Sequence, residues 1–247
     1  MAYYEKEKFV IFDEIPESYR LKSLGRGAHG EAFLTRDGMV YKELNNGVKY
    51  PEDLRVLTTL ESKHFAFPRR IIYLGERSDE TLKGYLSEPK EGYQFEDIPG
   101  STKVESIITA SEHFERDMAE LTRDNGMVVY DDLANNSNVL YSTTTGEFGA
   151  FDTDEYECYS LEEYPENMKH NLRIWAEYLL YNLGAYRYAF EDWKLNENFE
   201  TAIMSGKYRP SIFASEMLEA VRKASGERIE TLDEYNNNFG LILRKRY

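Results

Sequence analysis

The sequence predicts an α+β protein in two parts, a sheet-rich first part followed by a mainly helical second part. Up to about residue 90, short runs of β-branched and aromatic residues alternate with turn dipeptides, which is typical of strands and hairpins. Beyond about residue 103, apolar residues recur at helical spacing. The chain has 247 residues, of which 41% are hydrophobic, so it is long and apolar enough to fold as one large domain or two small ones.

In the first part, the strand-like segments cover residues 9–12, 24–34, 39–44, 71–74 and 82–87. Asp37-Gly38 lies between the second and third of them, and this dipeptide is typical of tight hairpins because glycine accepts a positive φ. A helix is expected to begin at Pro51, since proline suits the first helical position. Leu54, Leu57 and Leu60 would share one face of that helix.

In the second part, helices are predicted over residues 103–124, 167–183 and 215–224 and from residue 231 onward, and short strands over residues 128–130, 138–141 and 148–151. Gly126 is expected to end the first of these helices and Gly226 the third, because glycine readily takes the left-handed conformation of a C-cap. Ser215 is a candidate N-cap. Thr231 and Glu234 form a candidate capping box.

The charge balance and the cysteine content exclude several classes of protein. Asp and Glu outnumber Lys and Arg by 45 to 30, a formal net charge of -15, so neither a nucleic-acid partner nor an anionic membrane surface is expected. The one cysteine, Cys158, excludes an internal disulfide and a Cys-rich zinc site. The sequence has no apolar run of about 18 residues and no signal-peptide pattern near its start. A cytoplasmic protein is therefore expected, in its own cell or in a host to which it is delivered.

Gly25, Gly27 and Gly30 form the pattern G-x-G-x-x-G. A dinucleotide-binding site would need a helix directly after the glycines, and a Walker A site would need Gly-Lys-Ser/Thr, but strand-like residues and a hairpin turn follow here. The pattern favours a glycine-rich hairpin that covers nucleotide phosphates, with a plain hairpin as the alternative. Lys42 lies twelve residues after Gly30 on the next strand, from which its side chain would reach the phosphates; an exposed lysine on a polar strand face is the alternative.

A set of oxygen-bearing side chains follows in the middle of the chain. Asp131 and Asp132 precede a polar turn, Asn138 opens a short strand, and Asp152 follows the return strand. Phosphoryl transfer needs an acid beside the attacking hydroxyl and oxygen ligands for Mg²⁺, and this set provides both. Ordinary loop carboxylates and turn-forming asparagines are the alternative.

Taken in order, these motifs resemble the protein kinase-like superfamily over about residues 21–154. The resemblance implies a two-lobed fold, with a small antiparallel-sheet N-lobe in residues 1–88 and a hinge and short, mainly helical C-lobe in residues 89–247. It implies ATP and Mg²⁺ as cofactors. It also implies these roles: Gly25, Gly27 and Gly30 cover ATP, Lys42 binds its phosphates, Asp53 or Glu52 pairs with Lys42, the backbone from Glu88 to Lys90 binds adenine, Asp132 is the catalytic base, and Asn138 and Asp152 hold Mg²⁺.

The chain departs from the superfamily pattern in its catalytic and metal-binding motifs. The spacing from Asp132 to Asn138 is one residue longer, so Asp131 as the base and Asn136 as the metal ligand stay open. Tyrosine and aspartate stand where the catalytic loop has histidine and arginine, so control by a phosphorylated activation loop is not expected. The D-F-G motif reads Asp-Thr-Asp at residues 152–154, without the glycine, and the 95 residues that follow Asp152 are few for a full helical lobe.

The function expected from these residues is transfer of the γ-phosphate of Mg-ATP to a serine or threonine of a protein substrate, or to the chain itself. The surplus of acidic residues would favour a basic protein substrate. Two alternatives remain. One is a small-molecule phosphotransferase of the aminoglycoside or choline kinase type, and the other is a pseudokinase that binds a nucleotide or a protein without turnover.

Overall fold

The computed structural model describes the chain except for residues 1–8, 46–50, 130–132, 134–137, 185–208 and 245–247. The described residues contain a six-stranded sheet and five α-helices, so the predicted α+β class is confirmed. They form two compact units. The first holds the described residues up to Lys90 together with Phe151–Cys158, and the second holds the described residues of 91–150 and those from 159 onward. The division predicted after residue 88 had placed all of 151–158 in the second part.

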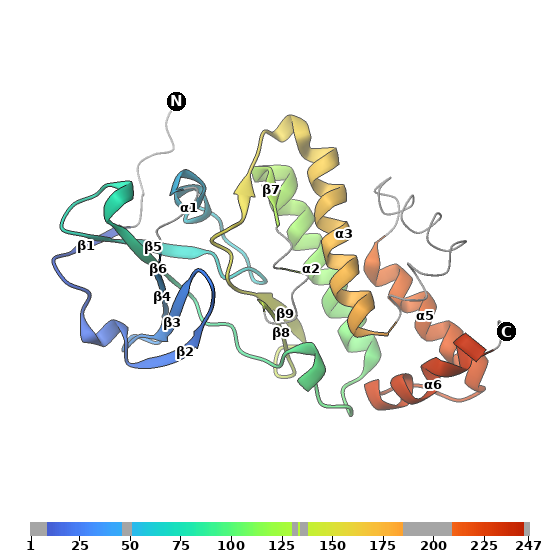
Figure 1. Cartoon of the computed structure of the whole chain (residues 1–247). Helices are drawn as coiled ribbons and strands as arrows, with labels where there is room; N and C mark the ends of the chain where they lie inside the picture. The colour runs from blue at the N-terminus through green and yellow to red at the C-terminus, as the bar shows by residue number, and fades with distance from the viewer. Residues whose placement is uncertain (1–8, 46–50, 130–132, 134–137, 185–208, 245–247) are drawn as a thin grey trace. The chain divides into compact units, whose positions relative to one another are not determined.

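The first unit is built on the six-stranded sheet, whose strand order is β1-β5-β6-β4-β3-β2 (Figure 1). The strands are β1 (Phe9–Phe12), β2 (Lys22–Arg26), β3 (Gly30–Leu34), β4 (Val40–Leu44), β5 (Pro68–Leu74) and β6 (Leu82–Ser87). β1 pairs with β5 in parallel, and the other pairs are antiparallel. The segment 24–34, predicted as one strand-like stretch, folds as two strands, because Gly27 donates its N–H to the carbonyl of Gly30 at 2.9 Å and closes a turn.

The strand registers set which side chains share a face of this sheet. One row of paired residues crosses four strands: Gly25, Ala32, Lys42 and Tyr85. Directly paired residues point to the same face. The face of this row also carries an apolar cluster of Leu44, Leu54, Ile71, Tyr73, Leu82 and Tyr85, and the opposite face is covered by Ile15, Tyr41, Ile72 and Leu86. The Lys42 side chain therefore lies on the same face of the sheet as the cluster that contains Tyr85.

The helix α1 (Pro51–Leu57) begins at the predicted proline. Leu54 and Leu57 are fully buried, as their spacing predicts. Leu60 is also buried but lies after the helix, so the prediction that it continues the helical face is wrong. Thr59 donates its N–H to the carbonyl of Val56 at 2.9 Å, a three-residue spacing that tightens the chain where the helix ends.

The second unit is mainly helical. Its helices are α2 (Val104–Asn125), α3 (Tyr164–Asn182), α5 (Pro210–Ser225) and α6 (Leu232–Arg244). Its short strands are β7 (Met127–Val128), β8 (Val139–Ser142) and β9 (Glu147–Ala150), whereas β10 (Glu157–Cys158) belongs to the first unit. Short 3-10 turns cover Glu17–Tyr19, Asp79–Thr81, Phe95–Asp97 and Leu161–Glu163.

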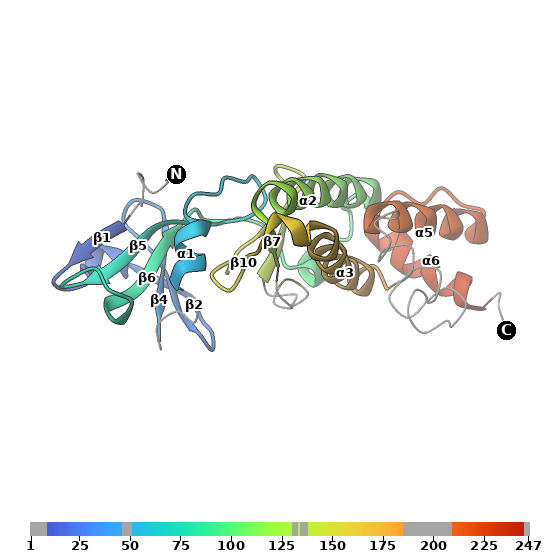
Figure 2. The same cartoon turned by 90° about the horizontal axis from the view of Figure 1, so that it is seen from above.

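The core of the second unit lies where α2 packs against α3 and α5. Figures 1 and 2 both show α2 and α3 side by side. Trp175 of α3 stacks on Phe114 of α2 with ring centroids 4.1 Å apart, and its indole N–H donates to the Ser111 hydroxyl at 2.8 Å. No helix in the described part of the chain combines the length and apolar character needed to cross a membrane.

The two glycine C-caps and the capping box predicted from the sequence are present in the structure. Gly126 and Gly226 end α2 and α5 with φ of 65° and 73°, so both predicted C-caps are confirmed. The predicted capping box of α6 is also confirmed, because the Thr231 N–H donates to the Glu234 carboxylate at 3.0 Å and the Glu234 N–H donates to the Thr231 hydroxyl at 3.3 Å.

The start of α5 differs from the prediction. The helix begins at Pro210, five residues before the expected N-cap Ser215. The buried carboxylate of Glu115, on α2, accepts hydrogen bonds from the backbone N–H and the hydroxyl of Ser211, both at 2.8 Å. A distant side chain thus caps the helix, and the negative charge suits its N-terminus.

Candidate functional site

Lys42 is held by two carboxylates of the first unit. Its ammonium donates to Asp154 Oδ1 at 2.8 Å and forms a second ion pair with Asp152. The side chain of Lys42 is only 10% exposed. Burial alone would lower the pKa of Lys42, but the charges of the two carboxylates raise it above its ordinary value. The lysine is therefore a buried, charged group on the sheet face that also carries Gly25 in its row.

The segment Asp152–Asp154 is fixed by its backbone and by a side-chain anchor. Asp152 is the one non-glycine residue of the described chain with a left-handed backbone, at φ 62°. Aspartate adopts this conformation more readily than most residues, because its short polar side chain can hydrogen-bond to nearby backbone. The next side chain, Thr153, is fully buried and donates its hydroxyl to the Ala66 carbonyl at 3.2 Å. The neighbouring aspartates are thereby left to meet Lys42.

The two carboxylates differ in their surroundings. The side chain of Asp154 is 6% exposed, and its Oδ1 accepts a second hydrogen bond from the Tyr85 hydroxyl at 2.8 Å. Burial alone would raise the pKa of Asp154, but the Lys42 ammonium and these hydrogen bonds lower it overall. Asp152 is 32% exposed at its side chain. Burial, aided by the charge of Asp154, raises the pKa of Asp152 to about 6 despite the opposing effect of Lys42.

The three glycines of the G-x-G-x-x-G pattern occupy different environments. A Cβ atom at Gly30 would lie 2.1 Å from the Glu43 carbonyl oxygen, so packing against β4 requires glycine there. At Gly25 and Gly27 a Cβ atom would meet no atom within 4 Å. All five residues of β2 are exposed. Packing in the protein therefore does not explain these two glycines, and close approach of a ligand to the backbone would.

The glycine-rich turn also lies near the aspartate segment. His29, at the tip of the turn, has its Nε2 atom 3.3 Å from Glu155 Oε1. The sheet row and residues 152–154 thus meet at Lys42, and the glycine-rich turn contacts the neighbouring residue Glu155 through His29, all within one unit.

The acid predicted on α1 has a different partner. The Asp53 carboxylate accepts a hydrogen bond from the Cys158 backbone, and burial raises its pKa. The alternative candidate, Glu52, is exposed. Lys42 forms ion pairs with Asp152 and Asp154, so the structure brings the lysine together with one predicted residue and one that was not predicted. Burial and the Asp53 charge raise the pKa of the Cys158 thiol to about 12, which makes it a poor nucleophile.

The two side chains expected near adenine interact with protein groups. Glu88 forms an ion pair with Arg69 at 3.1 Å. Lys90 donates to the backbone carbonyl of Lys63 at 2.5 Å. Both residues follow β6, which ends at Ser87. The expected contact with adenine involves the backbone of this segment, whereas the two side chains bind other parts of the protein and thereby hold the segment in place.

The remaining predicted residues belong to the second part of the chain. Asp131, Asp132 and Asn136 lie outside the described residues. Asn138 is described, is half-buried, and directly precedes β8 in the second unit. Among the residues that the structure does describe, no group of three or more His, Cys, Asp or Glu side chains is arranged to hold a metal ion.

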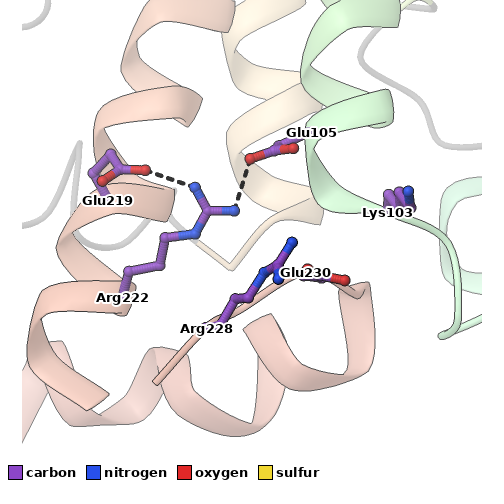
Figure 3. Close-up of a pocket in the computed structure, with 6 residues that line it drawn as sticks. All are labelled: Lys103, Glu105, Glu219, Arg222, Arg228 and Glu230. Atoms are coloured by element: carbon purple, nitrogen blue, oxygen red, sulfur yellow. Dashed lines mark hydrogen bonds and ion pairs between the residues drawn. The ribbon is translucent and has the colours of Figure 1, made fainter. Parts of the chain in front are cut away.

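A charged hollow of about 400 Å³ lies in the second unit, away from these residues in sequence. It is lined by Lys103, Glu105, Glu219, Arg222, Arg228 and Glu230 (Figure 3). Arg222 donates to Glu105 and Glu219, each at 2.7 Å, and to the Ile229 carbonyl at 2.8 Å. The three basic and three acidic side chains balance in charge, and Arg222 and Arg228 pair with the three glutamates. We interpret this cluster as a structural connection between α2, α5 and the segment before α6.

Sequence reasoning missed Asp154 and Tyr85. Asp154 stands where the D-F-G motif has glycine. The replacement of that glycine by an aspartate was the one indication in the sequence that residue 154 could contribute a further carboxylate to the site. Tyr85 looks like an ordinary apolar strand residue in the sequence, and only the pairing of β4 with β6, which sets it opposite Lys42, brings its hydroxyl to Asp154.

No protein-family model matches the chain, and no curated protein matches it. Residue type, spacing and geometry are therefore the features that bear on its function.

Proposed function

We propose that the chain is an ATP-dependent phosphotransferase of the protein kinase-like fold. It transfers the γ-phosphate of Mg-ATP to a protein hydroxyl, on a partner or on itself. The observation that carries the proposal is the pairing of the buried Lys42 with Asp152 and Asp154 in the row of the sheet that begins at Gly25. A glycine turn with accessible backbone, a fixed ammonium and an aspartate beside it are the parts that bind nucleotide phosphates.

In this proposal each residue does electrostatic or positioning work. Lys42 and the backbone amides of the turn orient the phosphates. Asp132 accepts the proton of the acceptor hydroxyl while the hydroxyl oxygen forms a bond to the γ-phosphorus. The bond between the γ-phosphorus and the bridging oxygen then breaks, and ADP leaves with that oxygen. Asp152 and Asn138 offer carboxylate and amide oxygens, which suit Mg²⁺. When bound, Mg²⁺ neutralises charge on the phosphate oxygens.

The acceptor is proposed to be a basic protein. The chain carries 15 more acidic than basic residues, so a basic partner would be attracted over a distance. Raising the salt concentration should then slow phosphorylation of a basic substrate more than it slows self-phosphorylation, because it screens attraction between separate molecules.

The test is a transfer assay with γ-labelled ATP and Mg²⁺, with and without a generic basic protein. Label should appear on one of the proteins, and Lys42→Ala, Asp132→Ala and Asp152→Ala should each abolish it. Circular dichroism and thermal melting show whether each variant still folds. Retained transfer in all three folded variants would contradict the proposal.

The same assay separates the alternatives. ATP consumption that depends on an added aminoglycoside or amino alcohol, without labelled protein, would indicate a small-molecule kinase. Nucleotide binding without any consumption would indicate a binding module. If the protein neither binds nor consumes ATP, a nucleotide has no part in its function.

A further inference from the structure

The buried position of Lys42 requires a fixed carboxylate beside it. An ammonium that is 10% exposed is costly unless it is paired. The sequence motifs assigned this task to an acid on α1, but Asp53 accepts its hydrogen bond from the Cys158 backbone instead. The carboxylate that holds Lys42 must then come from another segment.

Of the two aspartates beside Lys42, Asp154 has the surroundings of a permanent partner. Its side chain is 6% exposed, against 32% for Asp152. One of its oxygens accepts from both Lys42 and Tyr85, each at 2.8 Å. Tyr85 is itself buried and lies directly opposite Lys42 on the neighbouring strand, so the three groups form a closed set.

We infer that Asp154 is the positioning residue of Lys42, in place of an acid on α1, and that Tyr85 fixes the Asp154 carboxylate. Asp152, the more exposed of the pair, is thereby left to interact with the ligand. The importance of this set for phosphate binding rests on the proposed function, whereas the pairing of Lys42 with Asp154 does not.

A double-mutant cycle on unfolding tests the pairing without any assay of activity. Urea unfolding is measured for Lys42→Met, Asp154→Asn and the double variant. We expect Asp154→Asn to lower the unfolding midpoint in the presence of Lys42, and to lower it much less in the Lys42→Met background, because its partner is already gone. The matched cycle of Lys42→Met with Asp53→Asn should be additive.

The kinetic arm uses variants that keep the fold. Asp154→Asn should reduce kcat/KM for Mg-ATP at least tenfold, and Asp154→Glu, which keeps the charge, should recover part of the loss. Tyr85→Phe removes one hydrogen bond and should reduce kcat/KM by a smaller factor, mainly through KM. The factor by which Asp53→Asn reduces kcat/KM should be at least fivefold smaller than the factor for Asp154→Asn. Asp79→Asn, which removes an exposed ion pair with Arg55 in the same unit, is the control for loss of a carboxylate.

Each outcome is decisive. Additive unfolding for Lys42 with Asp154, or coupling with Asp53 in its place, would overturn the inference. So would an Asp154→Asn variant with wild-type kinetics in an active enzyme. If Asp154→Asn does not fold but the double variant with Lys42→Met does, the two residues are coupled as proposed. If the wild-type protein shows neither binding nor transfer, the proposed function fails, and the unfolding cycle still decides whether Asp154 holds Lys42.

Discussion

The glycines of the turn are predicted to respond differently to the same substitution. Gly30→Ala should lower the free energy of unfolding by about 1–3 kcal/mol, because the new methyl group would overlap the Glu43 carbonyl. Gly25→Ala and Gly27→Ala meet open space, so their stability should be unchanged or slightly raised. Under the proposed function both should weaken Mg-ATP binding. Urea unfolding and a nucleotide titration on the three variants measure these effects, and equal losses of stability would contradict the packing argument.

Glu115 gives the protein a pH-dependent term in its stability. Burial raises the pKa of Glu115 to about 7, against the hydrogen bonds from Ser211 and Ser111 that favour the charged form. The folded state therefore binds a proton that the unfolded state releases near pH 4.5. The stability contributed by this group is present below that pH and is lost as the pH rises towards 7, by an amount on the order of 3 kcal/mol.

Replacing Glu115 tests this sign. Glu115→Gln keeps the shape of the side chain and should flatten the difference in unfolding free energy between pH 5 and pH 8. Ser111→Ala keeps the titrating carboxylate and serves as the comparison. A Glu115→Gln variant with the wild-type pH profile would show that another group carries the dependence.

At the level of single side chains, the sequence predicted those site residues that belong to a motif with a recognisable spacing. It identified Gly25, Gly27, Lys42 and Asp152 as candidates, and the structure brings Lys42 and Asp152 together. It did not identify Asp154, which pairs with a lysine 112 residues away. That pairing depends on how one segment returns to the sheet, and no local pattern encodes it.

Helix ends that depend on glycine can be tested with a matched pair of substitutions. Gly226 caps α5 at φ 73°, so Gly226→Ala should cost about 1 kcal/mol. Gly240 lies inside α6, and a Cβ atom there meets no neighbour. Gly240→Ala should therefore stabilise the protein by about 0.5–1 kcal/mol. Thermal unfolding of the two variants measures both signs, and a loss in each would refute the argument.

The success of the element predictions followed the range of the interactions involved. The strands β1, β5 and β6 and the helix α2 carry their signals in their own residues and were predicted to within a few positions. The start of α5 was predicted five residues too late, because its cap is Glu115 on another helix. α1 ended before Leu60, which is buried by the fold without being helical.

For the chain as a whole, ligand binding should appear as added stability. If Mg-ATP binds the folded state alone, a concentration about a hundredfold above its Kd raises the unfolding free energy by about 2.7 kcal/mol. The shift should be much smaller in Lys42→Ala. Hydrogen exchange should locate the protection in β2, β3 and β4 and in residues 151–158. Protection confined to the second unit would argue for another binding site.

The return of residues 151–158 to the first unit has a consequence for dissecting the gene. No single cut separates the two units, since the sheet of the first unit lies before residue 91 and its segment Phe151–Cys158 follows only after residues 91–150, which belong to the second unit. A fragment that ends at Lys90 would retain Lys42 but lose both of its carboxylates, and should be poorly soluble on its own. A synthetic peptide spanning the eight residues from Phe151 to Cys158 could be added in trans to complete the unit. Lys42→Met removes the ammonium that needs those carboxylates, so it is the substitution best suited to make the fragment independent of the peptide.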